Sequence, residues 1–195
     1  MMILGVSGSP RPKATEYVCK NALAQLEELG YETAYWSVMG KKLNFCTHCD
    51  YCRKGEGCVF KDDMNTLYPL LEEASAYVFA TPVYNGNVSG QLKTVMDRCR
   101  ALFSKDNKVF RYKPVIAIAV GGDRVGGQEP AIQQISSFFI MNGGVPVSGG
   151  TFGANLGATF WSKDTLEGVM EDEEGFRSLS KTVKRLDKYL KEHSV

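Results

Sequence analysis

Short apolar runs alternate with amphipathic stretches along almost the whole chain. Four runs bounded by turn residues have the length and composition of buried strands: MILGVS, TAYWSV, AYVFATP and PVIAIAVGG. The last of them is apolar throughout, as is typical of a strand that is covered on both faces. A shorter run, VPVSGG at residues 145–150, predicts a fifth strand.

The stretches between these runs carry apolar residues at helical spacing. Residues 15–29 form an amphipathic pattern that stops at Gly30, a residue type favoured just past helix ends. Asp62 or Asp63 can cap a helix through LYPLLEEA, in which Pro69 must lie early or produce a kink. Further helices are predicted over residues 89–103, over residues 129–141, and from the acidic run at residues 171–174 onward.

Five strands that alternate with helices predict an α/β fold with a doubly wound, five-stranded parallel sheet. The 195 residues suit one domain with a full core. We therefore expect residues 1–195 to form a single domain. Residues 44–60, which are rich in cysteine, are expected to be an insertion within it, after the second strand.

Composition and charge narrow the function classes. The formal charge is +1 and the Lys and Arg residues are evenly spread, which argues against a nucleic-acid-binding surface. The apolar stretch at residues 1–6 is too short for a signal peptide or a membrane span. These features predict a cytoplasmic protein without a membrane partner, in a reducing environment that keeps cysteines as thiols.

Four cysteines stand close together in NFCTHCDYCRKGEGCVF, with the spacing C-x2-C-x2-C-x5-C. Thiolate sulfur is the preferred ligand of iron–sulfur clusters and of structural zinc. In the bacterial ferredoxin run the fourth cysteine follows after three residues, precedes a proline and binds a second cluster, whereas here Val59 follows and no second set exists. The pattern favours one cubane cluster with four local ligands, which are Cys46, Cys49, Cys52 and Cys58.

Other interpretations of the cysteines stay open. Zinc sites usually divide their ligands into two pairs a dozen or more residues apart, and this chain has no second pair, although His48 can replace one cysteine. Disulfides are disfavoured because nothing marks the chain as secreted. Cys19 and Cys99 stand alone in helical stretches and are expected to be small buried hydrophobic residues.

The loop SGSPRPKAT leaves the first strand and enters the first helix, and it can bind an anion. Two serines, a threonine and the free N–H groups of a helix N-terminus form a cradle for phosphate, and Lys13 adds charge. The segment is neither G-x-G-x-x-G nor a Walker A motif, so a dinucleotide fold or a P-loop NTPase is not supported. Alone, it is equally compatible with a turn capped by threonine. The candidates are Ser7, Ser9, Pro10, Arg11 and Thr15.

Two further loops follow the third and fourth strands. TPVYNGNVSG contains an Asn-Gly pair that favours positive φ, and its tyrosine offers an aromatic face to a planar ring. GGDRVGGQE lets a backbone approach a large flat ligand. Without a ligand, the first of these loops is a strand-to-helix turn with Ser89 as N-cap, and the second is a flexible linker. The candidates are Pro82, Val83, Tyr84, Asn85, Gly86, Asn87, Gly122, Asp123, Arg124, Gly126 and Gly127.

In the strand order 2-1-3-4-5, typical of flavodoxin-like sheets, strands one, three and four are neighbours and their loops meet at one edge. A phosphate cradle, a turn with an aromatic residue and a glycine-rich wall together suit flavin mononucleotide (FMN). The phosphate is expected on the first loop and the isoalloxazine ring on the other two.

The motifs SGSPR, TPVYNGNVSGQLKTVMDR and GGDRVGGQE resemble the NAD(P)H-dependent FMN reductase branch of the flavodoxin-like superfamily. With the cysteine insertion, the chain is similar to the iron–sulfur flavoproteins of anaerobic archaea and bacteria, over residues 2–150. The resemblance implies one FMN and one [4Fe–4S] cluster per subunit in a homo-oligomer, a dimer or tetramer. It places phosphate on the first loop and the ring on the other two. One departure is that relatives often have Gly-Asn-Thr where this chain has Lys-Ala-Thr at residues 13–15.

Three functions are compatible with these features. In the first, a ferredoxin-type donor supplies electrons to the cluster, the cluster to FMN, and FMN to a carrier or to oxygen species, because flavin joins one-electron to two-electron chemistry. The second is an NAD(P)H-dependent FMN or quinone reductase whose cysteines hold zinc or no metal, with Arg11 and Arg124 on the nicotinamide phosphate. The third is a zinc-stabilised binding module. We nominate no catalytic side chain.

Two expectations concern assembly. A cysteine loop inserted after strand two lies far from its own flavin edge, so the cluster is expected to face the FMN of a neighbouring subunit. The glycine-rich residues 149–161 are expected to form an interface or a cover over the active site.

Overall fold

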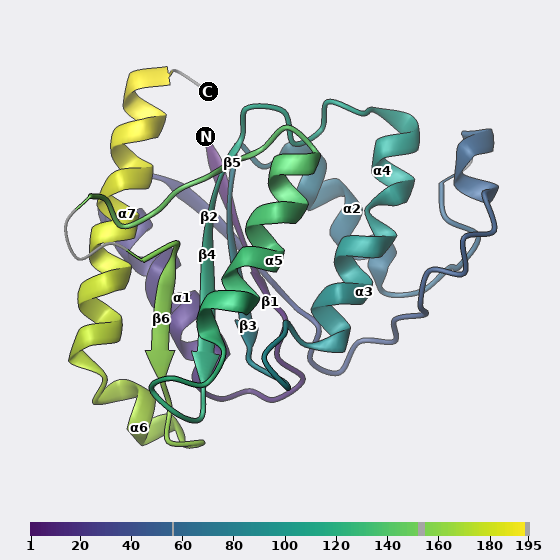
Figure 1. Cartoon of the computed structure of the whole chain (residues 1–195). Helices are drawn as coiled ribbons and strands as arrows, with labels where there is room; N and C mark the ends of the chain where they lie inside the picture. The colour runs from purple at the N-terminus through teal and green to yellow at the C-terminus, as the bar shows by residue number, and fades with distance from the viewer. Residues whose placement is uncertain (56, 152–154, 194–195) are drawn as a thin grey trace.

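In the computed structural model, which describes residues 1–55, 57–151 and 155–193, the apolar runs form one parallel sheet (Figure 1). Its strands have the order β2-β1-β3-β4-β5, which confirms the prediction. All their pairings are parallel. The four long strands are β1 (Met2–Ser7), β2 (Glu32–Ser37), β3 (Ala76–Pro82) and β4 (Pro114–Gly121).

The fifth position of the sheet differs from the prediction, because two short strands share it. β5 (Val145–Pro146) pairs with the beginning of β4, and β6 (Ala158–Trp161) pairs with its end. The prediction of a strand over residues 145–150 is therefore wrong beyond Pro146, and β6 was missed. Gly150 has a φ of +105°, which an extended strand does not allow, so the chain leaves the sheet edge before it returns as β6. Of the predicted cover at residues 149–161, residues 152–154 lie outside the described residues.

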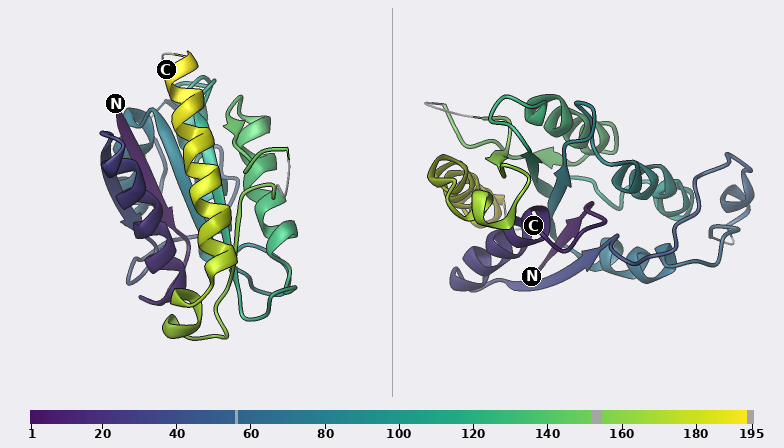
Figure 2. Two further views of the ribbon diagram at one scale, coloured as in Figure 1. Left: turned by 90° about the vertical axis from the view of Figure 1, so that its left-hand side faces the viewer. Right: turned by 90° about the horizontal axis from the view of Figure 1, so that it is seen from below.

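Helices cover both faces of the sheet, as a doubly wound fold requires (Figure 2). On one face lie α1 (Ala14–Glu28) and α7 (Glu173–His193). On the other lie α2 (Met64–Glu73), α3 (Gly90–Arg98) and α5 (Gln128–Met141). Every residue of β1, β3 and β4 is buried, since helices shield these strands from water on both sides.

The helix predicted over residues 89–103 divides at Cys99 into α3 and α4 (Arg100–Lys105). The short helix α6 (Leu166–Met170) was not predicted, and it precedes α7. Pro69 lies within α2, which begins at Met64. None of the helices in the described residues has the length and the apolar content that crossing a membrane requires.

The cysteine-rich segment follows β2 and extends from the side of the sheet, beyond α3 and α4 (Figure 1). Between β2 and α2 the described part of this segment contains a single regular element, the 3₁₀ helix η1 (Tyr51–Lys54). The loops that follow β1, β3 and β4 lie at the bottom of the same view, at the carboxyl edge of the sheet. The two groups of candidate residues therefore occupy different sides of the molecule.

Candidate cofactor sites

The three predicted loops meet at the carboxyl edge of the sheet and enclose a cavity. Seven of the predicted residues line it: Ser9, Arg11, Thr15, Pro82, Val83, Tyr84 and Gly122. The other predicted residues do not line it, and they lie at the end of β1 or in the same three loops: Ser7, Pro10, Asn85, Gly86, Asn87, Asp123, Arg124, Gly126 and Gly127. Several residues that the sequence analysis did not single out line it as well: Ala14, Val120, Ser162, Asp164 and Thr165.

The first loop presents the beginning of α1 to this cavity. Lys13 is the N-cap residue of α1 and makes no side-chain capping hydrogen bond, and Thr15 lies inside the first turn, not at the cap. The Ser9 hydroxyl donates to the carbonyl of Arg11 (2.9 Å) and accepts from its N–H (3.1 Å), which closes the loop tightly. A helix N-terminus beside buried hydroxyl groups is suited to an anion such as phosphate.

Ser89 joins the first loop to the second. As predicted, it is the N-cap of α3, where its hydroxyl oxygen accepts from the Leu92 N–H (3.1 Å). The same hydroxyl donates to the Gly8 carbonyl (2.6 Å), and the Ser89 N–H donates to the Thr81 hydroxyl (3.0 Å). A β-carbon on Gly8 would lie 2.7 Å from Cβ of Leu92, so the loops approach too closely for any side chain there. These contacts fix the relative position of the two loops.

The second loop makes a tight turn. Tyr84 and Asn87 exchange backbone hydrogen bonds of 3.0 Å, and the two residues between them have positive φ, 51° at Asn85 and 74° at Gly86. This is the geometry of a type I′ turn, which the Asn-Gly pair favours. The Gln134 side chain of α5 donates to the Asn87 side chain (2.6 Å) and holds the turn to that helix. Tyr84 remains 37% exposed at the rim of the cavity.

Gln128, which the sequence analysis missed, organises the third loop. Its buried side chain accepts from the Gly126 N–H (2.8 Å) and donates to the carbonyl oxygens of Asp123 (2.6 Å) and Phe160 (3.1 Å). Gly127 has a φ of +95°, and a β-carbon there would lie 2.7 Å from Cα of Gly86. The third loop therefore packs directly on the turn of the second.

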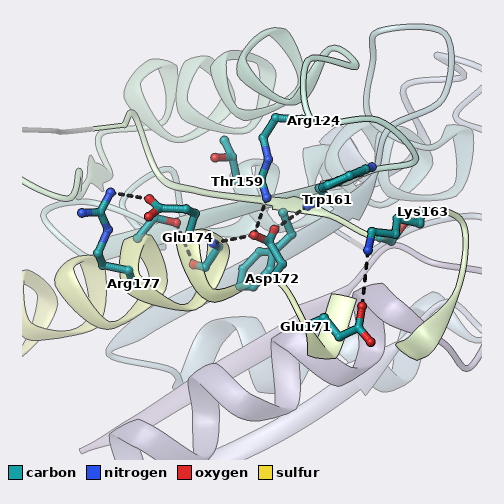
Figure 3. A network of polar contacts seen from close by, with 12 residues as sticks. Arg124, Thr159, Trp161, Lys163, Glu171, Asp172, Glu174 and Arg177 are labelled. Carbon is teal, nitrogen blue, oxygen red and sulfur yellow. Dashed lines mark hydrogen bonds and ion pairs between the residues drawn. The ribbon is translucent and has the colours of Figure 1, made fainter. Parts of the chain in front are cut away.

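Arg124 does not line the cavity. It pairs instead with Asp172, the residue before α7 (Figure 3). Its guanidinium donates to the Asp172 carboxylate (2.6 Å) and lies 5.4 Å from the centre of the Trp161 ring. The Asp172 carboxylate also accepts from the N–H groups of Trp161 (2.7 Å) and Gly175 (3.0 Å). Asp172 thus ties the third loop, the end of β6 and the beginning of α7 together. Its charged partner Arg124 is 48 residues away, which is why the sequence analysis did not identify this pair.

A fourth segment reaches the cavity from the end of β6. Ser162, Asp164 and Thr165 line it, and Thr165 also caps α6 by accepting from the Gly168 N–H (2.8 Å). An Asp164 carboxylate oxygen lies 2.7 Å from the place of a β-carbon on Gly122, so a side chain at that position would displace the Asp164 carboxylate. The segment was missed because β6 was missed, although the polar sequence SKDT after an apolar run was a usable signal.

The four cysteines predicted as ligands line one common cavity, together with Arg100 of α4 and Phe60. Cys52 is buried and Cys58 half-buried, whereas Cys46 and Cys49 are exposed. Within the described residues, no group of three or more His, Cys, Asp or Glu side chains is close enough to hold a single metal ion. A cubane cluster instead binds each thiolate through a different iron, so sulfur atoms placed around a cavity fit its chemistry.

The surroundings of these cysteines suit an anionic centre. His48 and Asp50, on either side of Cys49, have φ values of 54° and 58°, a strained conformation that is concentrated at ligand-binding loops. Arg100 lines the cavity and forms an ion pair with Asp50. The Ser104 hydroxyl lies 3.6 Å from the Cys52 sulfur. Cations and hydrogen bonds near the sulfurs are among the factors that set the potential of an iron–sulfur cluster.

Cys19 and Cys99 are buried in the core, as predicted. Burial, with a smaller contribution from the nearby Glu16 carboxylate, raises the pKa of Cys19 to about 12. Burial likewise raises the pKa of Cys99. Both thiols therefore stay neutral and behave as small apolar side chains.

We expect Asp62→Asn to destabilise the protein more at neutral than at acid pH. Burial by itself raises the pKa of Asp62, but hydrogen bonds from Arg98 and Asn44 outweigh it, so this pKa lies well below its usual value. Such a carboxylate contributes stability above its unfolded pKa of about 3.9, and the contribution is lost as pH falls through the folded value. Denaturant unfolding of both proteins at about pH 7 and about pH 3 measures the difference. A difference that does not shrink would contradict this prediction.

Comparison with known proteins gives consistent results. Residues 1–159 match the family model described as NADPH-dependent FMN reductase. The chain is 65% identical to an iron-sulfur flavoprotein of Archaeoglobus fulgidus, over 97% of both chains. It is 57% identical to one of Methanocaldococcus jannaschii, over 98% of both. Its fold is similar to that of RosB with a bound riboflavin-phosphate intermediate, with a TM-score of 0.77, 17% identity, and coverage of 100% of this chain and 82% of RosB.

Proposed function

Because the chain belongs to the iron–sulfur flavoproteins of the NADPH-dependent FMN reductase family, we propose that it is an electron-transfer flavoprotein of the cytoplasm. In this proposal a ferredoxin-type donor supplies single electrons to a [4Fe–4S] cluster. FMN receives them and delivers them to a carrier or to oxygen species. The main support for the proposal is that one chain contains two separate cavities, one at the carboxyl edge of the sheet and one lined by four cysteines.

The cavity at the sheet edge supports FMN as its ligand. The N-terminus of α1, with Ser9, Arg11 and Thr15, offers hydrogen-bond donors and positive charge to a phosphate. The Lys13 side chain makes no capping hydrogen bond to this helix. Pro82, Val83 and Tyr84 offer an apolar and aromatic wall for the ring. Bound flavin supplies the exchange between one-electron and two-electron steps. The task of these residues is to orient it and to limit its contact with water.

The cysteine cavity supports a cluster. We propose Cys46, Cys49, Cys52 and Cys58 as its four ligands, since all four line the same cavity. Arg100 and the Ser104 hydroxyl lie where they would stabilise negative charge on the sulfurs. Phe60 and Ala101 contribute an apolar wall to this cavity.

The second candidate is an NAD(P)H-dependent FMN or quinone reductase whose cysteines hold zinc or no metal. The description of the matching family model favours it. Arg11 lies at the cavity and is available to a nicotinamide phosphate, but Arg124 is engaged by Asp172. Rapid bleaching of bound flavin by NADPH alone would support this candidate.

The position of the two sites also supports a homo-oligomer, a dimer or tetramer, as the working form. The cysteine segment extends from one side of the molecule, away from the loops at the carboxyl edge (Figure 1). We propose that the cluster of one subunit faces the FMN of a neighbour. Rapid electron transfer between the two centres in a verified monomer would contradict this arrangement.

The decisive experiment is the visible spectrum of the protein purified without oxygen, together with iron, sulfide and flavin contents. We expect flavin bands superimposed on a broad iron–sulfur absorbance that dithionite bleaches, with about four iron atoms per flavin. Flavin without iron or sulfide, even after anaerobic reconstitution, would favour the reductase. Colourless protein that contains zinc would favour the binding module.

A further inference from the structure

Arg98, the last residue of α3, has one of the largest fully buried side chains among the described residues. Its side chain is 1% exposed, and that of its partner Asp62 is 6% exposed. Arginine is almost never fully buried unless it is paired, because removing its charge from water is unfavourable. A buried ion pair is often no more stabilising than an apolar pair of the same size, so general stability does not explain its presence.

The contacts of Arg98 reach both ends of the cysteine-rich segment. One guanidinium nitrogen donates to the Asn44 carbonyl (2.7 Å) and to Asp62 (2.9 Å), and a second donates to the other Asp62 oxygen (3.0 Å). Asn44 also donates to Asp62 directly, through its backbone N–H (2.8 Å) and its side-chain amide (2.9 Å). The Phe60 ring lies 5.3 Å from the guanidinium carbon. Asn44 precedes the first cysteine of the segment and Asp62 follows the last.

From this arrangement we infer that Arg98 is a positioning residue for the cysteine centre. With Asp62 it closes residues 44–62 into a loop on the end of α3, so that the four thiols already surround one cavity before a metal centre is assembled. Closing a flexible loop is entropically unfavourable, and a fixed closure removes that penalty from metal binding. The bidentate guanidinium fork also sets the orientation of the loop, which a single-point charge does not do.

The helix that ends at Arg98 begins beside two of the loops that enclose the cavity at the carboxyl edge of the sheet. α3 is capped by Ser89, whose hydroxyl donates to Gly8 in the first loop. The cysteine segment is thus held to the same rigid element that fixes the first and second flavin loops. Arg98 therefore also sets the place of the cysteine cavity relative to the flavin cavity within the subunit.

The test compares Arg98→Met, the double variant Arg98→Met/Asp62→Leu, and Arg98→Lys with the full-length wild-type protein. Iron and sulfide bound per chain are measured after anaerobic reconstitution, together with the melting temperature. Hydrogen exchange of residues 44–62 is measured in cluster-free protein. Lys93→Met is the matched control, because Lys93 forms an ion pair with Asp97 (2.6 Å) on the same helix but is exposed.

We expect the Arg98→Met protein to bind iron about ten- to a hundredfold more weakly, the range seen when residues that orient metal ligands are changed. The double variant should recover the melting temperature, because no buried charge is left unpaired, without recovering iron binding or slow exchange of the segment. Arg98→Lys should keep iron binding and slow exchange of the segment only in part. Wild-type iron binding and exchange in the double variant would overturn the inference.

The biological role of Arg98 rests on the proposed cluster, but different results would contradict the cluster and the positioning role. If the wild-type protein takes up no iron and sulfide, the proposed cluster is wrong, and the exchange measurement still tests whether Arg98 holds the segment. If the wild-type protein takes up the cluster and the double variant does so equally well, only the positioning role is wrong.

Discussion

Replacing Cys49 by serine is expected to give a protein that keeps its flavin but loses most of its iron–sulfur absorbance. A serine hydroxyl is not ionised at neutral pH and is a poor substitute for a thiolate ligand. Changes in partners outside the ligand set already weaken metal binding about 10- to 100-fold, so loss of a ligand should weaken it at least as much. Cys49 is exposed, and the fold should therefore be unaffected. Iron, sulfide and flavin contents after anaerobic reconstitution measure the effect.

The matched control for this change is Cys19→Ala. Cys19 lies in α1 and is buried in the core, and its sulfur is 3.2 Å from the place of a β-carbon on Gly5, on the face of the sheet that α1 and α7 cover. Its loss should lower stability by about 1 kcal/mol. It should leave the iron content unchanged. An iron content that falls equally in both variants, or in neither, would contradict the assignment of Cys49 as a ligand.

Replacing Gly127 by alanine is expected to produce the opposite result, loss of flavin with retention of iron. Gly127 has a φ of +95°, which costs other residues of order 1–3 kcal/mol. Its new β-carbon would also lie 2.7 Å from Cα of Gly86, so the backbone of the second or third loop must move. Flavin binding should weaken by about ten- to a hundredfold, since each 1.4 kcal/mol is a factor of ten. Fluorescence titration of flavin-depleted protein with FMN measures this change.

Gly30→Ala separates backbone strain from displacement of the loops. Gly30 has nearly the same φ, +92°, but no atom lies within 4 Å of its added β-carbon. It follows α1 at the end remote from the cavity. The control should therefore lose a similar amount of stability from strain alone and bind FMN normally. Equal flavin affinity in both variants would show that contact between the second and third loops does not shape the flavin site.

Much of the fold follows from local patterns of apolar and polar residues in the sequence. A strand that is buried on both faces is apolar along almost its whole length, as β1, β3 and β4 are, whereas a helix that is buried on one side has apolar residues at helical spacing, as α1 does. These two patterns identified a doubly wound parallel sheet. Strand order then implied which loops meet at the carboxyl edge. The four cysteines were evident from spacing alone, since their ligand chemistry is carried by one short segment.

Contacts between segments far apart in the sequence left no such pattern, and only the tertiary structure decided them. Two short strands share the edge beside β4, since the chain leaves this edge after β5, passes through Gly150 with a positive φ and returns as β6. This return brings Ser162 to the cavity at the carboxyl edge of the sheet. Arg124 is paired by Asp172, 48 residues away. Of the two predicted caps of α2, Asp63 is at the N-cap position, whereas Asp62 is paired with Arg98, 36 residues away. Periodicity records whether a position is buried, whereas the partner of a buried charge depends on how helices and loops pack around the sheet.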